Sequence, residues 1–407
     1  FCLSRGLGDV YKRQVYILCK GSMDSLIEKV NLSKTEKQEI LDKVKNLSKK
    51  ALRTLGFAYK KLDYIPKDIK ELEKEEYNLS FAGILGMIDP PRESVKESVV
   101  LCKNAGIRPI MITGDSIDTA TAIAKDVGII SNDDEAILGS ELDKYNDKEL
   151  EDIVKQYSVY ARVNPSHKER IVFALQNSGK IVAMTGDGVN DAPAIKDAHV
   201  GVGMGITGTD VTKSASDIVL MDDSFSTIVV AVEEGRRIYN NIRNNIVFSL
   251  SSNFAEIFTI IIGLLSKTTI LLPIYILFID LVTDSIPSIC LSFEKSEDGI
   301  MNKKPRGINK PLFTPFIKSC IASSAIIETI FVVLTYFISL KMYGQETAMS
   351  LALLSMVVQE IVYSISCRNL KQSITKQGLF SNKAMNYGLL LIFLIELIVF
   401  ILSLIHI

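Results

Sequence analysis

Long, nearly uninterrupted apolar stretches dominate the second half of the chain, whereas the first half alternates short apolar runs with polar and charged residues. Each long stretch reaches or approaches the roughly 20 residues that a helix needs to cross a bilayer. The pattern therefore predicts an all-α transmembrane bundle over residues 236–404, with a helix over 234–245 continuing into the first span. The five predicted membrane helices cover residues 246–265, 270–293, 313–340, 348–366 and 386–404.

Two smaller domains are predicted before the membrane part. Residues 15–78 combine two strand-like runs with a charged helical stretch, most of which is a solvated face. Residues 79–235 repeat strand and helix, beginning with a strand at 81–88 and including buried-type apolar runs at 107–112 and 181–184. Such alternation is typical of a mostly parallel, Rossmann-like α/β sheet with helices on both faces.

The most specific short motif is the string Thr-Gly-Asp-Gly-Val-Asn-Asp at residues 185–191, directly after one of these apolar runs. Ligands of open α/β sheets bind at the carboxyl ends of the strands. The side chains of Asp187, Asn190 and Asp191 would lie at that end, and their oxygens suit Mg²⁺, which commonly also binds substrate phosphate. An acidic surface turn is the simpler alternative.

Two other strand ends carry residues that suit a phosphate group. Thr113, Gly114 and Asp115 stand where an apolar run meets the next predicted helix, and a hydroxyl with free backbone amides at such a junction forms a phosphate cradle. Lys168 follows the run that ends near Tyr160, and its ammonium group can neutralise a phosphate. The alternative for Lys168 is a surface lysine at the start of a helix.

Polar side chains interrupt the first two membrane stretches. The interrupting residues are Asn253 and Glu256 on the first and Asp280, Thr283 and Asp284 on the second. Their spacings of three and four residues place each set on one helical face. An uncompensated acid at mid-bilayer costs roughly 2.5–3.5 kcal/mol or more, so such groups are normally functional. With carbonyls freed by Pro287, they can form an oxygen cage for a hard cation. Hydrogen bonding between helices is the alternative.

Taken together, these strings resemble the motifs of P-type ATPases, the cation pumps of the haloacid-dehalogenase superfamily. The resemblance extends from about residue 15 to about residue 400. It implies a partial nucleotide-binding domain at 15–78, a haloacid-dehalogenase-like phosphorylation domain at 79–235 and the transmembrane domain at 236–404. The implied cofactors are ATP and Mg²⁺.

The resemblance also implies roles for individual residues. Those expected at the phosphoryl-transfer site are Thr113, Gly114, Asp115, Lys168, Asp187, Asn190 and Asp191, with Asp187 holding Mg²⁺. Those expected to contact the nucleotide are Lys20, Arg53 and Arg162. Those expected to hold the transported cation are Asn253, Glu256, Asp280, Thr283, Asp284 and Glu360, the last from the fourth predicted span.

Two parts of the family pattern are missing. The Asp-Lys-Thr-Gly-Thr string that carries the phosphorylated aspartate does not occur, and neither do the actuator domain and the first membrane helices. The sequence is therefore expected to be the C-terminal part of an ion-translocating ATPase, inactive by itself. Residues 1–14 have no counterpart in the family and are interpreted, with 402–407, as non-native additions.

Charge and cysteine content bear on the partners and the location of the protein. The net charge of −1 gives no indication of a nucleic-acid partner, and the six cysteines show no metal-binding or disulfide spacing. Basic residues concentrate in the loops at 294–312 and 367–384. Because basic loops remain in the cytosol, we expect a multi-pass protein of the cell membrane, embedded in the lipid bilayer, with its α/β domains cytosolic.

The transported ion is predicted to be Ca²⁺. Up to four carboxylates in the cage favour a divalent ion, and most of the expected ligands match the calcium-pump branch. Asp280 instead matches the sodium–potassium branch, so a Na⁺/K⁺-type pump is the alternative. A second alternative, from another class, is a non-pumping membrane protein whose phosphatase-like domain serves as a sensor or anchor.

Overall fold

The structure is a computed structural model that describes residues 15–48, 52–66, 69–87, 90–307, 310–373, 376 and 378–405. The predicted non-native segment at 1–14 lies outside these residues, as does part of the one at 402–407. The chain divides into two compact units, Phe1–Val229 and Val230–Ile407. Each unit is described by itself below.

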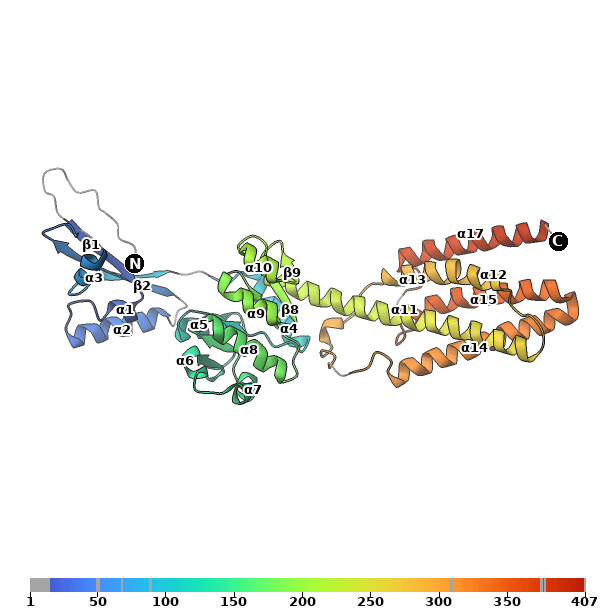
Figure 1. Cartoon of the computed structure of the whole chain (residues 1–407), viewed down its shortest axis with the longest axis horizontal. Helices are drawn as coiled ribbons and strands as arrows, with labels where there is room; N and C mark the ends of the chain where they lie inside the picture. Colours follow the sequence, from blue (N-terminus) through green and yellow to red (C-terminus); the bar gives the residue numbers. More distant parts are fainter. Residues whose placement is uncertain are drawn as a thin grey trace. The chain divides into compact units, whose positions relative to one another are not determined.

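The first unit begins with an antiparallel sheet in the order β1-β2-β3 (Figure 1). Its strands are β1 Val15–Gly21, β2 Arg53–Leu62 and β3 Ser80–Met87, accompanied by the helices α1 Met23–Leu26, α2 Lys34–Ser48 and α3 Ile69–Glu75. Buried Ile17, Leu26 and Leu79 form its core. The strand predicted at 81–88 exists as β3, but it pairs antiparallel with β2 instead of opening the parallel sheet, so its predicted pairing was wrong. An apolar run of this kind can pair either with β2 or with the parallel strands, so the sequence alone did not show which pairing forms.

Two parallel sheets follow, in the orders β4-β6-β5 and β7-β8-β9. Their strands are β4 Met111–Ile112, β5 Ala136–Leu138, β6 Val159–Ala161, β7 Ala183–Gly186, β8 Val200–Met204 and β9 Ile218–Leu220. The predicted parallel pairing is confirmed, although the strands form two three-stranded sheets. Pro109 lies in the apolar run ahead of β4 and lacks an N–H group, which helps to explain why β4 begins only at Met111.

Helices alternate with these strands as predicted. They are α4 Ser94–Asn104, α5 Ile117–Asp126, α6 Gly139–Leu142, α7 Asp147–Gln156, α8 Pro165–Asn177, α9 Ala192–Asp197 and α10 Asp210–Ala215, with short 3₁₀ turns at Asp133–Glu135 and Val189–Asp191. Local sequence fixes where α8 begins, because Asn164 caps its first turn and Pro165 occupies the first position. Fully buried Tyr160, Ile171 and Ile195 pack in one core beneath the strand ends.

The second unit is built of helices. They are α11 Phe225–Leu265, α12 Pro273–Phe278, the π-helical turn η3 Ile279–Asp284, α13 Ser285–Ser292, the 3₁₀ turn η4 Ile300–Asn302, α14 Pro315–Tyr343, α15 Gln345–Cys367 and α17 Lys383–Ile405. The predicted continuation of the helix at 234–245 into the first span is confirmed, since α11 is one helix of 41 residues.

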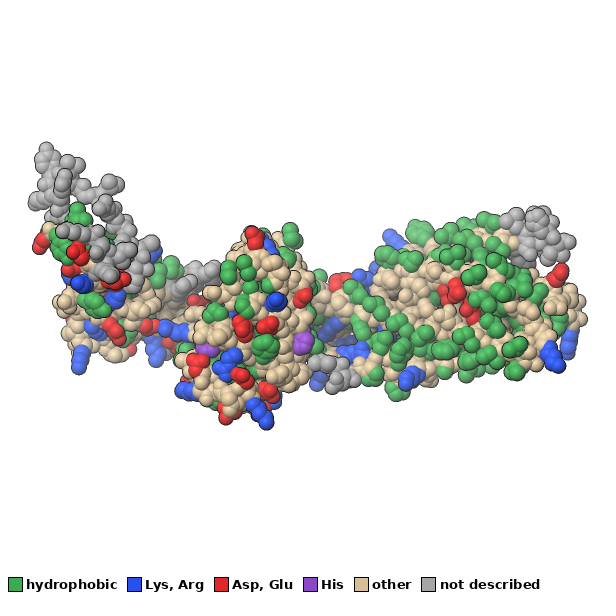
Figure 2. Space-filling view, viewed as in Figure 1, with side chains coloured by type: hydrophobic (Ala, Val, Ile, Leu, Met, Phe, Trp, Pro, Cys, Tyr) green, Lys and Arg blue, Asp and Glu red, His purple; other side chains and the backbone are tan. Residues whose placement is uncertain are grey.

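Four helical segments in the described residues are long and apolar enough to cross a membrane, namely Phe225–Leu265, Pro273–Ser292, Pro315–Tyr343 and Gln345–Cys367. Between 33% and 44% of an 18-residue apolar stretch in each segment is buried, so much of the apolar surface is left uncovered within the described structure. Figure 2 shows hydrophobic side chains spread over this unit, whereas charged side chains are frequent on the α/β unit. The chain is an integral membrane protein. The fifth predicted span falls within α17 and stays a prediction, because some of its side chains lie outside the described set.

A buried ion pair joins the ends of three helices in this unit. Arg368, just after α15, donates to both carboxylate oxygens of Glu294 at 2.8 and 3.1 Å, and their side chains are 1% and 6% exposed. Asn382, just before α17, donates to the same carboxylate at 2.8 Å, and Asn241 of α11 donates to the Glu294 carbonyl at 3.0 Å. Arg368 is therefore a structural partner of Glu294 as well as one of the basic loop residues.

Arg368→Gln removes the charged group that donates to both carboxylate oxygens of buried Glu294. Arg368→Gln should lower the free energy of unfolding by roughly 3–5 kcal/mol, the usual cost of breaking a buried pair. The matched control is Lys303→Gln, whose half-exposed side chain pairs with Glu297, and it should cost less than about 1 kcal/mol. The temperature at which buried Cys290 and Cys367 react with a thiol-specific dye measures unfolding. Equal unfolding midpoints for the two variants would refute the stabilising role of the Arg368–Glu294 pair.

Candidate functional site

The Gly-rich turn after β7 depends on close packing against Asp191. A Cβ atom added to Gly186 would lie 2.5 Å from the Cβ of Asp191, so a side chain there would displace it. Asp191 is 7% exposed, and its Oδ2 accepts from the backbone amide of Gly188 at 3.3 Å. The side chains of Asp187 and Asn190 are exposed at the same strand end. The turn thus holds one carboxylate inward and leaves a second one accessible.

Lys168 is the partner of this inward carboxylate. It lies in the first turn of α8, and its ammonium group forms an ion pair with Oδ1 of Asp191. The two side chains are 17% and 10% exposed, so water screens the pair only partly. Because α8 follows β6 and Asp191 follows β7, the pair connects the strand ends of the two parallel sheets.

Thr113, Gly114 and Asp115 form the turn between β4 and α5. The backbone amide of Asp115 donates to the hydroxyl of Thr113 at 3.1 Å. Backbone hydrogen bonds of 3.2 Å from Val163 to Thr113 and of 3.0 Å from Arg162 to Asp115 tie this turn to the segment that follows β6. The predicted phosphate cradle and the segment that leads to Lys168 are therefore adjacent.

Within the part of the chain that the structure describes, no contact joins Lys20 to Arg162, two of the residues expected to contact the nucleotide. Lys20 is exposed on β1, where it pairs with Phe57 across the sheet. Arg53 begins β2, and its side chain lies outside the described set. The guanidinium group of Arg162 forms an ion pair with the carboxylate of Asp24.

The polar residues of the membrane helices meet around the hydroxyl of Ser252 on α11. This oxygen lies 3.1 Å from Oδ1 of Asp284 and 2.7 Å from Oε1 of Glu360. The hydroxyl of Thr283 donates to the other carboxylate oxygen of Glu360 at 2.6 Å. Exposed fractions of 0% for Ser252 and Glu360 and 7% for Asp284 show that this cluster is enclosed. Three separate segments, α11, η3 and α15, contribute to it.

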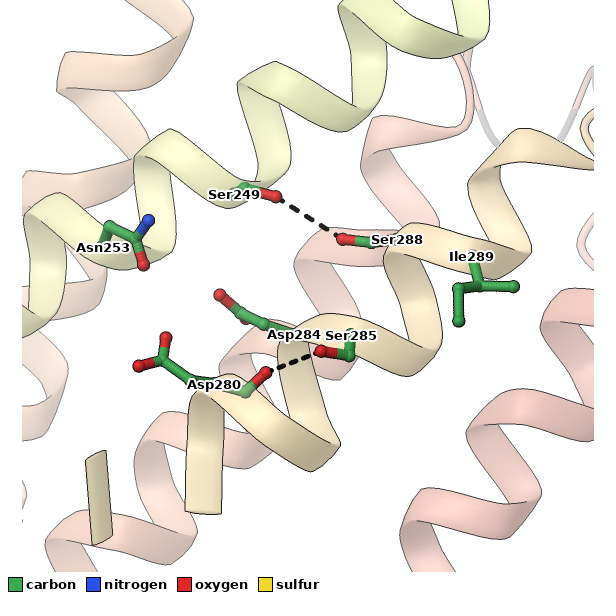
Figure 3. Close-up of a pocket in the computed structure, with 7 residues that line it drawn as sticks. All are labelled: Ser249, Asn253, Asp280, Asp284, Ser285, Ser288 and Ile289. Carbon is green, nitrogen blue, oxygen red and sulfur yellow. Dashed lines mark hydrogen bonds between the residues drawn. The ribbon is translucent and has the colours of Figure 1, made fainter. Parts of the chain in front are cut away.

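A largely open pocket of about 410 Å³ adjoins this cluster (Figure 3). Asn253 from α11 and Asp280 and Asp284 from η3 line it, together with the hydroxyl-bearing residues Ser249, Ser285 and Ser288. Glu256 is 5% exposed on α11, and one of its oxygens, Oε1, is buried without a hydrogen-bond partner among the described residues. The structure thus places the six predicted cation ligands around one enclosed cluster and its adjoining pocket.

Two residues of this region stood outside the predicted ligand set. Ser252 supplies the central hydroxyl, and its match to a position of the sodium–potassium branch was the available signal. Glu328 on α14 is 4% exposed, and its position in the third apolar stretch was the available signal. The predicted break near Pro287 is a full π-helical turn, η3, which precedes the proline. Such turns occur frequently at functional sites.

Comparison with known proteins identifies the class and then the family. A family model described as "P-type ATPase, cytoplasmic domain N" matches residues 12–94, and one described as "Cation transporting ATPase, C-terminus" matches residues 268–406. The chain belongs to the cation-transporting P-type ATPases.

Individual relatives agree with this family. A calcium-transporting ATPase of Bacillus cereus is 41% identical over 94% of this chain and 46% of its own length. One of Listeria monocytogenes is 39% identical over 97% of this chain and 44% of its own length. A human potassium-transporting ATPase alpha chain is 34% identical over 94% of this chain and 45% of its own length. The chain thus spans less than half the length of these relatives.

The bridging role of the Ser252 hydroxyl can be tested by protein stability, without measuring any activity. Ser252→Ala leaves Oδ1 of Asp284 and Oε1 of Glu360 without this donor, and we expect the free energy of unfolding to fall by roughly 1–3 kcal/mol. In the control Ser285→Ala, the lost hydroxyl is exposed and donates only within its own helical segment, to the Asp280 carbonyl at 2.8 Å. Thiol-dye melting curves should separate the two variants, and coincident curves would contradict the bridging role.

Proposed function

We propose that the complete protein is an ATP-driven pump that exports Ca²⁺ across the cell membrane. The observation that carries this proposal is the enclosed set of Asp284, Glu360, Ser252 and Thr283 oxygens inside a bundle with an apolar outer surface. Oxygen ligands of high total charge favour a divalent hard cation. The calcium-transporting relatives from Bacillus cereus and Listeria monocytogenes support the same ion.

Phosphoryl transfer is assigned to the strand ends of the α/β part, which is then a haloacid-dehalogenase-like phosphorylation domain. The γ-phosphoryl group of ATP passes to an aspartate that the family carries in an Asp-Lys-Thr-Gly-Thr string, absent from this sequence. The Thr113 hydroxyl and the backbone amides of the Gly114–Asp115 turn orient the phosphoryl oxygens. Lys168 places a positive charge beside them, and its pair with Asp191 fixes the position of that charge.

The residues at the end of β7 fit Mg²⁺. No group of three metal-ligating His, Cys, Asp or Glu side chains occurs within the described part of the chain. Mg²⁺ does not require such a group, because it is usually bound by one or two carboxylates, waters and substrate phosphates. The exposed Asp187 carboxylate would hold it, with Asn190 and Asp191 nearby. When bound, the ion offsets the charge that develops on the transferred phosphoryl group.

ATP is assigned to the antiparallel part of the first unit. The family model for cytoplasmic domain N covers β1 to β3, which contain Lys20 and Arg53, two of the proposed nucleotide contacts. Arg162 follows β6 and forms an ion pair with Asp24 of α1, and it is the third proposed nucleotide contact. A guanidinium group suits bidentate phosphate binding. The basic loops at 294–312 and 367–384 support a cytosolic location of the α/β domains.

A monovalent-cation pump of the Na⁺/K⁺ type is the second candidate. Asp280 and the human potassium-transporting relative favour it. The family assignment argues against the remaining alternative, a non-pumping sensor or anchor, because the Bacillus cereus, Listeria monocytogenes and human relatives are all named as transporting ATPases.

Asp187 provides the test of the phosphoryl-transfer site. In the complete pump, Asp187→Asn should slow phosphorylation by ATP by about a hundredfold or more, because it removes a ligand of the charge-compensating ion. Asp197→Asn, at the exposed end of α9, should leave the rate unchanged. Incorporation of labelled phosphate from ATP measures both. Wild-type incorporation by the Asp187 variant would remove Asp187 from the site.

Ion dependence decides between the two pump types. We expect micromolar Ca²⁺ to stimulate phosphorylation of the complete pump in sodium-free buffer, and Asp280→Asn to retain this stimulation. The reason is that the cluster of Asp284, Glu360, Ser252 and Thr283 remains intact in this variant. A strict requirement for Na⁺, with Ca²⁺ without effect, would establish the monovalent alternative.

A further inference from the structure

Helix α14 contributes a buried acid to the same region as the proposed cation ligands. Its inward face contains Ala325, Glu328, Thr329 and Val332, all of them 4% exposed or less. The hydroxyl of Thr329 lies 3.3 Å from the backbone carbonyl of Ala255 on α11. Glu328 and Glu256 are the sequence neighbours of these two residues, so the contact brings α14 against α11 at the level of both acids.

The carboxyl groups of this region fall into two kinds. Both oxygens of Glu360 and Oδ1 of Asp284 lie within hydrogen-bond distance of the Ser252 or Thr283 hydroxyl, and Ser252 can donate its one proton to either Glu360 or Asp284. In contrast, Oε1 of Glu256 and Oε1 of Glu328 are buried without a hydrogen-bond partner among the described residues. A buried carboxylate oxygen without a donor requires either a proton or a cation.

Glu328 interacts electrostatically with the acids of the other helices. The charges of Asp284 and Glu256 both act on it, and its own charge acts on Glu360. Four carboxyl groups from α11, η3, α14 and α15 therefore interact electrostatically with one another. Acids that interact in this way repel one another unless cations or protons lie among them.

Glu396 on α17 shows that burial alone does not produce this arrangement. It is 9% exposed, and its Oε1 also lacks a partner within the described residues. Its carboxyl group shows no electrostatic interaction with the other acids of the described residues. Within the described structure, Glu328 and Glu396 are thus only 4% and 9% exposed and each has an unpartnered oxygen, but only Glu328 interacts electrostatically with the other acids of the site.

We propose that Glu328 is a ligand of the transported cation and forms, with Glu256, a second carboxylate pair on the α11–α14 side of the site. This inference rests on the proposed function of a cation pump. The pair offers its unpartnered oxygens to a hard divalent cation, whereas the pair of Asp284 and Glu360 is bridged by Ser252. Helix α14 then belongs to the site, in addition to the three segments assigned from the sequence.

The test compares Glu328→Gln with Glu396→Gln in the complete purified pump. Radioactive calcium bound at equilibrium and the calcium dependence of phosphorylation are measured for both variants and the wild type. Glu328→Gln should bind fewer ions per pump, or bind them at least about tenfold more weakly, because ligand charge controls the affinity of such sites. Glu396→Gln should match the wild type in both measurements.

Thermal unfolding separates a ligand from a structural acid. In chelator, Glu328→Gln should melt at the wild-type temperature, because the amide replaces a carboxyl group of the same shape. Added Ca²⁺ should stabilise this variant less than the wild type, since the shift follows the binding affinity. If Glu328→Gln does not fold, Glu328→Asp keeps the charge on a shorter side chain, and weaker calcium binding at an unchanged melting temperature in chelator supports the proposal.

The outcomes distinguish this inference from the function on which it rests. Wild-type calcium stoichiometry and affinity in Glu328→Gln, or in Glu328→Asp where only that variant folds, would overturn the role of Glu328 and leave the pump function standing. Equal losses in the Glu328 and Glu396 variants would also overturn it, because burial alone would then explain both. A wild-type pump that neither binds Ca²⁺ nor is phosphorylated in its presence would refute both proposals.

Discussion

Burial of carboxyl groups among apolar helices is the constraint on which the membrane unit depends. Glu360 is fully enclosed and Asp284 nearly so, and each would be strongly destabilising without partners for its oxygens. The hydroxyls of Ser252 and Thr283 supply partners, and they come from α11 and η3, whereas Glu360 comes from α15. These segments therefore have to pack in one relative register. The same hydrogen bonds that hold the carboxylates also fix the arrangement of the helices.

The π-helical turn η3 contributes acids both to the enclosed cluster and to the adjoining pocket. Thr283 and Asp284 are buried against α11 and α15, whereas Asp280 is exposed and lines the adjoining pocket. In a regular α-helix, positions three and four residues apart share one face. The wider turn departs from that spacing, which helps to explain how neighbouring acids obtain different surroundings. The local backbone irregularity thus determines which oxygens are enclosed and which are accessible.

The sequence predicted the parts of the fold that depend on local pattern. Membrane helices followed from apolar length, and the parallel pairing of β4 to β9 followed from strand–helix alternation. The pairing of β3 with β2 was not predictable, because an apolar strand has the same pattern in either sheet. Ser252 and Glu328 were not predicted as ligands for a related reason. Ser252 donates to a residue far away in the chain and Glu328 interacts electrostatically with one, and spacing along one helix does not show such interactions.

Serine and threonine hydroxyls suit this site because they can act in two ways. A hydroxyl donates one hydrogen bond and also carries two acceptor lone pairs. In the structure, Ser252 and Thr283 are placed to donate to the carboxylate oxygens around them. A hard cation would instead bind the oxygens of the hydroxyls and the carboxylates together. Rotation of a hydroxyl group therefore lets its oxygen either donate to a carboxylate or bind a cation, while the neighbouring carboxyl groups still need a proton or a cation to limit their repulsion.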